Sequence, residues 1–446
     1  MSIGPDKAAR AEFARRRKQL KRMMGENSIA ILFAAPERVR SRDVAYRYRQ
    51  DSDFYYLTGF TEPESVAVLI PGRSQGEFVL FCRERNPERE LWDGQRAGTD
   101  GACERFGADD AFPIDDIGDI LPGLIEGAAR VFYTMGQYPD CDAQVTEWVC
   151  GLRGRNIMGV DAPTEMVALD HYLHDMRLFK SRYEITRMRK AAKVAVSAHK
   201  RAMRAVAPGM TEFSLEAEYL HEFRLHDGVP SYPPIVGGGQ NACVLHYTDN
   251  ANVLQDGDLV LVDAGCEIDY YASDVTRTFP VNGRFTDEQR ALYDIVLEAQ
   301  LAAIDATRAG NHWNEPHLAA TRVITAGLKR LGILTGGLKT LLKNERYREF
   351  FMHRTGHWLG IDVHDVGDYM VDDTWRLLEP GMVITVEPGI YIPHGSSADP
   401  RWQGIGIRIE DDVLVTKQGP DELSKGLPKS VQDIERWMQG GTQVAA

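Results

Sequence analysis

The chain has 446 residues, which is more than one hydrophobic core usually organises, so we expect two domains. With 43% apolar and 26% charged residues, its composition is that of an ordinary soluble globular protein. The formal net charge of −13 leaves no basic surplus to neutralise phosphates, which argues against nucleic acid as a main partner.

Three further features of the sequence bear on where the protein is located in the cell. No run approaches the roughly 18 apolar residues of a membrane span, and the N-terminal segment has no apolar signal region. The six cysteines show no CxxC pairing, so they predict neither a zinc knuckle nor a disulfide framework. We therefore expect a cytoplasmic protein that does not bind a membrane.

The first 160 residues alternate short apolar segments with helical stretches, which predicts a mixed α/β domain. A basic run at 15–22 is interleaved with Phe13 and Leu20, and it favours the solvated face of an amphipathic helix over a binding tail. Long helices begin near 165–180, so we divide the chain into domains 1–174 and 175–446. The buried strands expected in the first domain are 29–33, 66–70, 76–81 and 131–133.

The second domain shows the same order of elements twice. Ser181 and Glu184 predict a capping box that starts a helix ending at 208–209, and a second helix covers 211–226 before the apolar strand 259–262. The second half has a capping box at Thr286 and Gln289, a helix at 315–331, and strands at 382–386 and 405–415. This order predicts a pseudo-symmetric sheet clasped by helices, with a binding site between the two halves.

Four carboxylates and one imidazole stand in the short stretches LVDAGCEIDYYASDVTRTF, HRTGHWLGIDVHD, VEPGIY and GIRIEDD. Ligands of this kind suit a pair of hard or borderline divalent ions, and two-ion sites typically activate a shared water. The pattern therefore predicts a hydrolase. The candidate ligands are Asp263, Asp274, His357, Glu387 and Glu410.

The first two ligand candidates flank a predicted hairpin turn at 266–270. Antiparallel pairing about that turn places Asp263 opposite Asp274, with Cβ atoms roughly 5 Å apart. Two bare carboxylates at that distance repel unless a cation lies between them. The alternative, two exposed turn aspartates, is weakened because Asp263 directly follows four apolar residues.

Two other ligand candidates have charged or histidine neighbours. His353, His357 and His364 fall within a dozen residues, and a purely structural hydrogen-bonding role stays open for His353. Arg408 and Glu410 share one face of a predicted strand, where the arginine can hold the glutamate ionised and oriented. A plain surface ion pair is the alternative for these two residues.

These stretches, together with YRYRQDSDFYYLTGFTEPESVAVLI, SYPPIVGGGQNACVLHYTDN and LEPGMVITVEPGIYI, resemble the aminopeptidase P family of pita-bread metallopeptidases over nearly the whole chain. The resemblance implies an α/β (α+β) fold with an N-terminal mixed α/β domain and a pseudo-symmetric pita-bread catalytic domain. It also implies a metal-dependent aminopeptidase that cleaves between an N-terminal residue and a following proline. A related Xaa-Pro dipeptidase (prolidase) is the alternative activity.

The resemblance also implies a role for each residue. Asp274 and Glu410 would bridge two divalent ions, usually Mn²⁺, with a hydroxide between them as nucleophile; Asp263 would complete one ion's shell, and His357 and Glu387 the other's. Glu387 would also accept and shuttle the proton.

Further residues would contact the substrate. His246 and His364 would contact the substrate carbonyl and the developing oxyanion, and His353 and Arg408 would shape the proline pocket. Tyr391 would add a wall or a hydrogen-bond donor. Trp92 would reach the active site of a neighbouring subunit in a homo-oligomer, a dimer or tetramer, with ordinary packing as the alternative.

Overall fold

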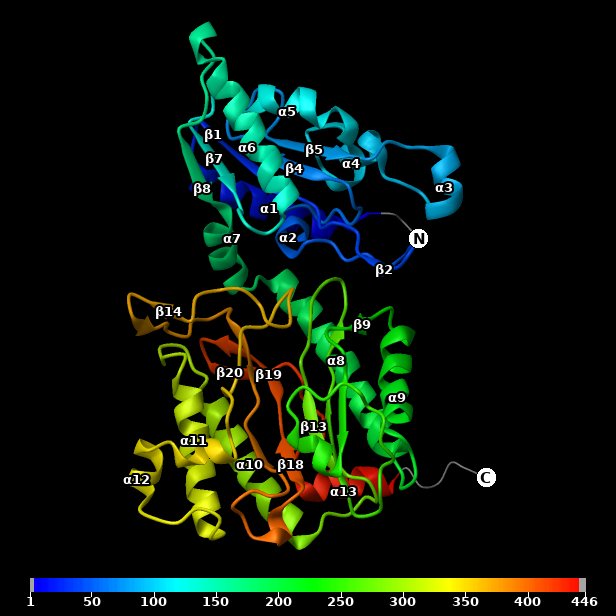
Figure 1. Cartoon of the computed structure of the whole chain (residues 1–446), viewed down its shortest axis with the longest axis vertical. Helices are drawn as coiled ribbons and strands as arrows, with labels where there is room; N and C mark the ends of the chain where they lie inside the picture. Colours follow the sequence, from blue (N-terminus) through cyan, green and yellow to red (C-terminus); the bar gives the residue numbers. More distant parts are fainter. Residues whose placement is uncertain (1–3, 441–446) are drawn as a thin grey trace. The chain divides into compact units, whose positions relative to one another are not determined.

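The computed structural model describes residues 4–440, and the chain divides into two compact units, Met1–Met176 and Arg177–Ala446 (Figure 1). The first unit is built on a six-stranded sheet with the order β6-β5-β4-β1-β7-β8. All four strands predicted from the sequence belong to it. Its strands are β1 (Ser28–Phe33), β4 (Val66–Leu69), β5 (Phe78–Cys82), β6 (Asp110–Pro113), β7 (Arg130–Tyr133) and β8 (Glu165–Ala168).

This sheet is mixed. β4 pairs antiparallel with β1 and β5, whereas β6, β7 and β8 each join a parallel neighbour. Its buried side chains, such as Val68 and Phe81, pack with Leu121 of α5 (Ile117–Ile125) and Leu152 of α6 (Pro139–Gly154) into one core. A small hairpin, β2 (Val39–Ser41) and β3 (Val44–Ala45), is exposed. The helices are α1 (Lys7–Met24), α2 (Ser52–Thr58), α3 (Pro87–Asp93), α4 (Gly98–Phe106), α5 (Ile117–Ile125), α6 (Pro139–Gly154) and α7 (Leu169–Leu178).

The basic run on α1 is not a wholly solvated face, and this part of the sequence prediction is wrong. Arg16 and Arg17 are buried. Their guanidinium groups donate to the backbone carbonyls of Tyr56 and Leu57 on α2, and Arg16 also lies over the Tyr56 ring. An arginine can bury its aliphatic stem while its nitrogens bind carbonyl oxygens, so a basic pattern alone does not show which face is solvated.

The C-terminal unit contains two long helix pairs, and both predicted capping boxes are confirmed. Ser181 caps α8 and exchanges hydrogen bonds with Glu184, and Thr286 does the same with Gln289 at the start of α10. In Figure 1 the α8–α9 pair and the α10–α11 pair flank the strands of this unit. Its helices are α8 (Arg182–Ala205), α9 (Glu212–Leu225), α10 (Asp287–Ala306), α11 (Glu315–Arg330), α12 (Leu338–Lys343) and α13 (Val431–Gln439).

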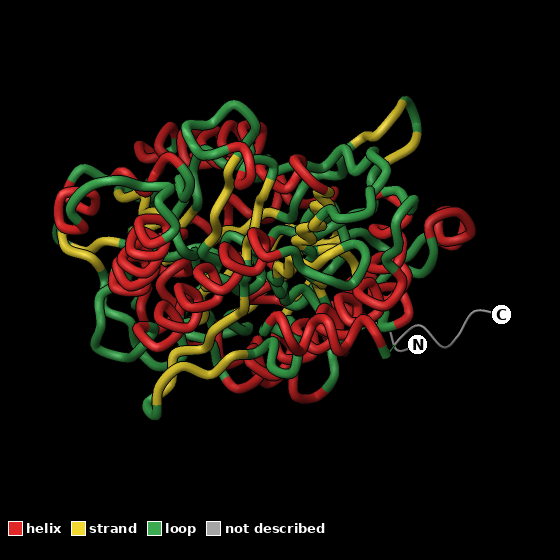
Figure 2. The backbone as a smooth tube through the Cα atoms, turned by 90° about the horizontal axis from the view of Figure 1, so that it is seen from below, coloured by secondary structure: helices red, strands yellow, loops and turns green. Residues whose placement is uncertain are grey.

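The strands of this unit repeat one arrangement, as the duplicated order of elements predicts. β10-β11-β13 in the first half and β16-β19-β20 in the second are three-stranded sheets, accompanied by the pairs β9-β12, β14-β15 and β17-β18. Figure 2, which shows the whole chain from below, has several strands in its interior between helices and others at its edge. The strands of the C-terminal unit are β9 (Val229–Pro230), β10 (Ile235–Gly238), β11 (Leu259–Asp263), β12 (Cys266–Glu267), β13 (Thr276–Pro280), β14 (Met370–Val371), β15 (Thr374–Trp375), β16 (Val383–Val386), β17 (Gly389–Ile392), β18 (Ile405–Arg408), β19 (Asp411–Thr416) and β20 (Gly419–Glu422).

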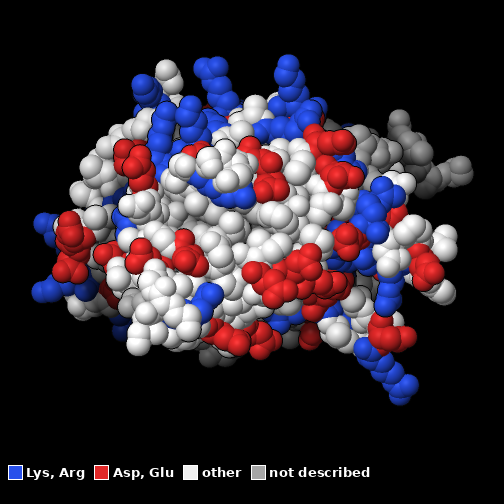
Figure 3. Space-filling view, turned by 90° about the horizontal axis from the view of Figure 1, so that it is seen from above, with Lys and Arg blue, Asp and Glu red and all other residues white. Residues whose placement is uncertain are grey.

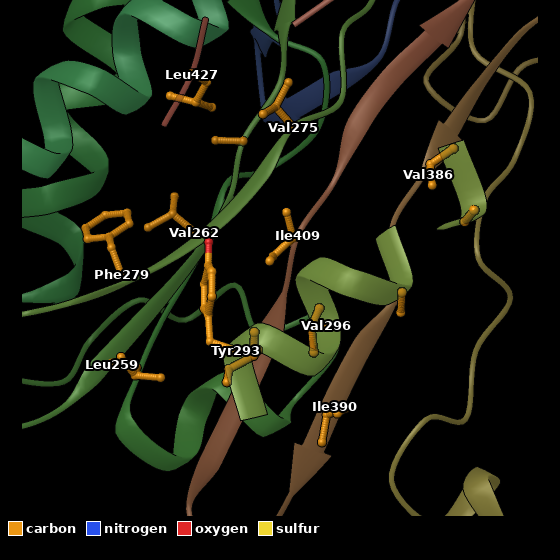
Figure 4. Packing of buried hydrophobic residues seen from close by; sticks show 14 of the residues in the cluster. Leu259, Val262, Val275, Phe279, Tyr293, Val296, Val386, Ile390, Ile409 and Leu427 are labelled. Carbon is orange, nitrogen blue, oxygen red and sulfur yellow. The ribbon is translucent and has the colours of Figure 1, made fainter. Parts of the chain in front are cut away.

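One continuous hydrophobic core joins the two halves. Figure 4 shows Val262 from the first half and Ile409 from the second together with Tyr293 and Val296 of α10. All four side chains are buried completely. Because the apolar faces of both halves pack into the same core, the polar ends of their strands are held in a fixed relation to each other.

The hairpin that carries Asp263 and Asp274 differs from the sequence prediction by one residue in its turn. The turn residues are Asp269 and Tyr270, both with positive φ, and Asp263 pairs with Thr276 rather than with Asp274. Such a two-residue turn matches the twist of its strands, and moving the centre of a hairpin by one residue moves each cross-strand pair by two. The two aspartates are therefore diagonal neighbours on one face.

Surface and cysteine features add little constraint on function. On the face seen in Figure 3, acidic and basic side chains are interspersed. The six cysteines are all free. Within residues 4–440, none of the helices combines the length and the apolar character needed to cross a lipid bilayer.

Candidate metal centre and active site

The five predicted metal ligands lie around one cavity of about 350 Å³ in the C-terminal unit. Asp263 ends β11, and Asp274 lies just before β13. Glu387 directly follows β16, Glu410 lies between β18 and β19, and His357 lies in the loop before β14. The structure thus gathers residues separated by up to 147 positions, as predicted from the duplicated halves. The lining residues are Leu245, His246, Asp263, Asp274, His353, Arg354, Gly356, His357, His364, Tyr369, Glu387, Arg408 and Glu410.

Three of these ligands form the tightest group. One ligand atom each from Asp274, His357 and Glu410 lie within 4.8 Å of one another. His357 Nε2 is 3.3 Å from Asp274 Oδ2 and 3.7 Å from Glu387 Oε1. These separations bring carboxylate and imidazole donors to a common centre, as a metal ion requires.

The orientation of His357 fits a metal ligand. Its Nδ1 donates to the carbonyl of Trp358 at 2.9 Å, which leaves Nε2 facing the carboxylates. A metal-binding histidine commonly fixes its ring in this way, by donating its other N–H to a carbonyl. Burial lowers the pKa of His357, but the hydrogen bond to Asp274 and the charge of Glu387 outweigh it and raise that pKa to about 9.

The carboxylates are crowded and buried. Burial, together with the charges of Asp274, Glu387 and Asp263, raises the pKa of Glu410 well above its usual value. Burial also raises the pKa of Glu387 to about 7, although His357 and Arg408 act against it. Ionised carboxylates this close repel one another, so they either take up a proton or bind a cation. The donor set, four carboxylates and one imidazole, therefore fits divalent metal ions.

Arg408 forms its ion pair with Asp263, whereas the sequence linked it to Glu410. Its Nη2 lies 2.6 Å from Asp263 Oδ2, and its Nε donates to the Thr276 hydroxyl. Glu410 accepts instead from that hydroxyl at 2.6 Å. Arg408 and Glu410 both line the cavity, and the charge of Arg408 acts to lower the pKa of Glu410 even without a direct contact.

A chain of hydrogen bonds continues from this ion pair to His353. Arg408 Nη1 donates to the Tyr391 hydroxyl, which donates to His353 Nε2; both distances are 2.9 Å. His353 Nδ1 donates in turn to the Arg354 carbonyl at 2.7 Å. Burial and the charge of Arg408 lower the pKa of His353 to about 3. His353 is therefore a neutral imidazole with a fixed tautomer on one wall of the cavity.

Glu387 owes its position to the end of a buried strand. It follows β16, and its backbone N–H donates to the Thr355 carbonyl at 2.9 Å. On that neighbouring segment Gly356 approaches β16 so closely that a Cβ there would lie 2.0 Å from the Thr385 carbonyl oxygen. Only a glycine fits at this crossing, which brings His357 and Glu387 together.

Two residues at the site were missed by the sequence reasoning. The Tyr232 hydroxyl lies 2.5 Å from one oxygen of Asp263 and 2.5 Å from one oxygen of Asp274, so the two carboxylates share its single proton. Asp412 is buried and accepts the backbone N–H of Asp274 at 3.1 Å. Tyr232 lies in SYPPIVGGGQ, which carries no signal for a tyrosine beside two acids, and Asp412 reads as one more acid in IEDD.

The remaining predicted residues fall into two groups. His246 and His364 line the cavity and are exposed at its mouth, where the His364 ring lies 4.4 Å from that of His357. Trp92 lies on α3 of the N-terminal unit, outside the cavity lining, with 86% of its surface exposed.

Comparison with known proteins gives the family. Residues 186–417 match the model described as metallopeptidase family M24, and residues 13–133 match the aminopeptidase P N-terminal domain. The chain belongs to metallopeptidase family M24. This membership confirms the pita-bread fold expected from the sequence. M24 is a family of metallopeptidases, so membership also implies divalent metal ions.

Three relatives of this M24 protein are similar over almost their whole length. An Escherichia coli (strain K12) Xaa-Pro aminopeptidase is 46% identical, with 96% of this chain and 98% of the relative covered. The structure of Pseudomonas aeruginosa aminopeptidase PepP matches with a TM-score of 0.96 at 57% identity, covering 99% of each chain. Aminopeptidase P from E. coli with the inhibitor Pro-Leu matches with a TM-score of 0.94 at 46% identity, covering 97% and 98%.

Proposed function

We propose that this protein is a metal-dependent Xaa-Pro aminopeptidase, which releases the first residue of peptides that carry proline second. The observation that carries this proposal is the gathering of Asp263, Asp274, His357, Glu387 and Glu410 around one cavity. Relatives named Xaa-Pro aminopeptidase, matched over both units, favour this activity over that of a dipeptidase. Peptides with proline at the second position are the proposed partners.

The proposed ligand set would hold two divalent ions, with Mn²⁺ as the proposed ion in the cell. Asp274 and Glu410 would serve both ions, Asp263 would serve one, and His357 and Glu387 would serve the other. The orientation of His357 Nε2 and the close carboxylates support this assignment. When bound, a pair of divalent ions polarises the scissile carbonyl and makes water a better nucleophile at neutral pH.

The protein's own groups then manage protons and position. Glu387, at the edge of the cavity, accepts the proton of the attacking water and passes it to the proline nitrogen as the C–N bond breaks. That nitrogen carries no hydrogen in the substrate, so it must gain a proton to leave as a secondary amine. His246 and His364, which are exposed residues of the cavity lining, are assigned the donation of hydrogen bonds to the carbonyl oxygen.

The specificity for proline is assigned to the wall formed by His353 and Arg408, with the buried Tyr391 outside the cavity lining and bonded to both. The hydrogen-bond chain through these residues supports the assignment, because it fixes their side chains before substrate arrives. His353 is neutral and presents its ring to the cavity, which suits an apolar pyrrolidine.

Assembly, domain limits and location complete the proposal. We propose a homo-oligomer, a dimer or tetramer, in which Trp92 reaches a neighbour's active site; the exposure of Trp92 and Leu91, 86% each, supports a contact there. We retain the functional division into 1–174 and 175–446. The six free cysteines support a cytoplasmic location.

The test is a peptide panel with purified enzyme and added Mn²⁺. We expect cleavage of Xaa-Pro-Xaa peptides, with release of the first residue, and much slower cleavage of matched Xaa-Ala-Xaa peptides. Cleavage confined to Xaa-Pro dipeptides would show a dipeptidase instead, and equal rates for alanine and proline would remove the proposed specificity.

A further inference from the structure

Arg354 lies at the mouth of the active-site cavity and has no part in the hydrolysis described above. It directly follows His353 in the segment HRTGHW and belongs to the cavity lining. Unlike Asp274, Arg408 and Glu410, which are buried in the interior, Arg354 is exposed. It therefore stands where a peptide bound in the cavity would pass towards solvent.

The guanidinium of Arg354 is held by uncharged groups. Nη1 donates to the side-chain oxygen of Asn314 at 2.9 Å, and the guanidinium carbon lies 5.1 Å from the centre of the Trp375 ring. Such contacts orient an arginine without neutralising its charge. Together they fix the position of a positive group at the rim.

The charge of Arg354 is not matched by an acid. Within residues 4–440, no carboxylate oxygen lies within 4.0 Å of its nitrogens, and Nε and Nη2 make no hydrogen bond there. The other arginine of the cavity, Arg408, is ion-paired with Asp263 at 2.6 Å. Arg354 thus offers an open edge with two N–H directions, which is the geometry that binds a carboxylate through two parallel hydrogen bonds.

The direction in which a peptide substrate lies in the cavity determines which part of that substrate can bring a carboxylate to Arg354. No residue precedes the ammonium group of an aminopeptidase substrate, so that end occupies the enclosed part of the cavity, and the chain beyond proline leaves through the mouth. A cation at the mouth repels an ammonium and attracts an acid. The part of the substrate that reaches Arg354 is therefore the segment after proline.

We propose that Arg354, oriented by Asn314 and Trp375, forms a carboxylate-binding subsite at the mouth of the active site. The subsite takes either the C-terminal carboxylate of a short Xaa-Pro-Xaa peptide or an acidic side chain after proline. It sets a preference among Xaa-Pro substrates and rests on the proposed aminopeptidase activity. Because Arg354 is exposed, its contribution is modest, about fivefold in kcat/KM.

Two pairs of peptides separate the two sources of the carboxylate. The first pair is Ala-Pro-Leu and its C-terminal amide, and the second is Ala-Pro-Glu-amide and Ala-Pro-Gln-amide. Each is assayed with wild type, Arg354→Gln and Arg354→Lys, with Arg401→Gln as the matched control. Arg401 is also an exposed arginine over a tryptophan ring, but it lies outside the cavity lining.

The wild type is expected to prefer the acid member of at least one pair about fivefold. Arg354→Gln is expected to lose that preference while it cleaves the amide or Gln peptide at the wild-type rate. Arg354→Lys should retain part of the preference, and Arg401→Gln should retain all of it. Equal rates on both members of both pairs in the wild type, or an Arg354→Gln loss that is equal for acid and amide, overturns the proposal.

Binding of Pro-Leu and Pro-Leu-amide, measured by calorimetry, provides a readout that does not depend on turnover. Wild type should bind Pro-Leu more tightly than the amide, and Arg354→Gln should bind both alike; a wild type that does not distinguish them contradicts the subsite. If the wild type cleaves no Xaa-Pro peptide, the proposed function fails, whereas this comparison still decides on the carboxylate subsite.

Discussion

The guanidinium of Arg408 lies 2.6 Å from the carboxylate of Asp263, Nη2 to Oδ2, and 5% and 13% of the two side chains are exposed. The same guanidinium also donates to Thr276 and Tyr391, so one arginine connects a proposed metal ligand to the proposed proline wall. A lysine cannot make three such bonds in a fixed plane, although it keeps the charge.

We therefore expect Arg408→Lys to fold but to bind metal more weakly. Loss of a partner that orients a ligand typically weakens metal affinity by about 10- to 100-fold. A Mn²⁺ titration of activity with metal-stripped enzyme measures this shift. Arg401→Lys serves as the control on an exposed arginine outside the cavity. An unchanged Mn²⁺ midpoint for Arg408→Lys would show that Asp263 needs no such support.

Tyr232 offers a second test of ligand positioning. Its single O–H is shared between Asp263 and Asp274, and Tyr232→Phe removes this contact with both acids while it keeps the ring. We expect a weakening of Mn²⁺ affinity of about tenfold with little change in thermal unfolding. The matched control is Tyr247→Phe, which removes a hydroxyl bonded to Glu212, away from the cavity lining. Equal effects of the two variants would refute a specific role for Tyr232.

Features with a local signal could be predicted from the sequence, and features that depend on tertiary partners could not. The candidate metal ligands could be predicted because carboxylates at the ends of apolar strands stand out against their surroundings, as Asp263 and Glu387 do. The capping boxes at Ser181 and Thr286 were found because their signal is local and spaced by three residues. Both depend on neighbours along the chain.

What the sequence could not show depends on register and on tertiary partners. A turn at Asp269 and Tyr270 moves every cross-strand pair by two residues, so that Asp263 pairs with Thr276 and not with Asp274; the ion pair of Arg408 with Asp263 joins two strands far apart in the sequence. No local pattern distinguishes that turn from a longer one. Tyr232 likewise reaches the acids only through the folded backbone, so its role has no signature in the sequence around it.

The pH dependence of stability can be tested away from the metal ligands, at Asp365. Its carboxylate accepts from Arg177 at 2.6 Å and from Lys180 at 2.9 Å, and all three side chains are buried. Burial raises the pKa of Asp365, but the charges of Lys180 and Arg177 outweigh it and hold that pKa below the usual 3.8. The ionised Asp365 carboxylate therefore stabilises the folded state above pH 3.8, and this contribution is lost as the pH falls through the lowered pKa of Asp365.

Asp365→Asn should reduce the free energy of unfolding by about 3 kcal/mol at pH 7, because two buried cations lose their shared carboxylate. Urea unfolding of the metal-free proteins measures the difference between wild type and variant. That difference should shrink as the pH is lowered below 3.8. A difference that stays constant, or grows, in acid would mean that the Asp365 charge is not the source of the stability.

The proposed contribution of Trp92 to a neighbouring subunit can be tested by mixing two inactive or weakened chains. Trp92→Ala should lower kcat/KM by about two- to tenfold, the value of an aromatic contact, whereas the control Leu91→Ala, equally exposed, should not. Trp92→Ala chains supply an intact metal site, and Glu387→Ala chains supply an intact Trp92. Mixed assemblies should exceed the summed activities of the separate variants; no rise on mixing, with oligomers confirmed by light scattering, contradicts sharing of Trp92.

The most direct test of the central proposal is Mn²⁺ reactivation of metal-stripped enzyme on an Xaa-Pro-Leu peptide, with bound metal counted in parallel. We expect no cleavage without metal, recovery as the chain approaches two bound ions, and release of free Xaa with Pro-Leu as the second product. Glu387→Ala should remain inactive at every Mn²⁺ concentration. Cleavage by the metal-free wild type, or full activity in Glu387→Ala, would contradict the account.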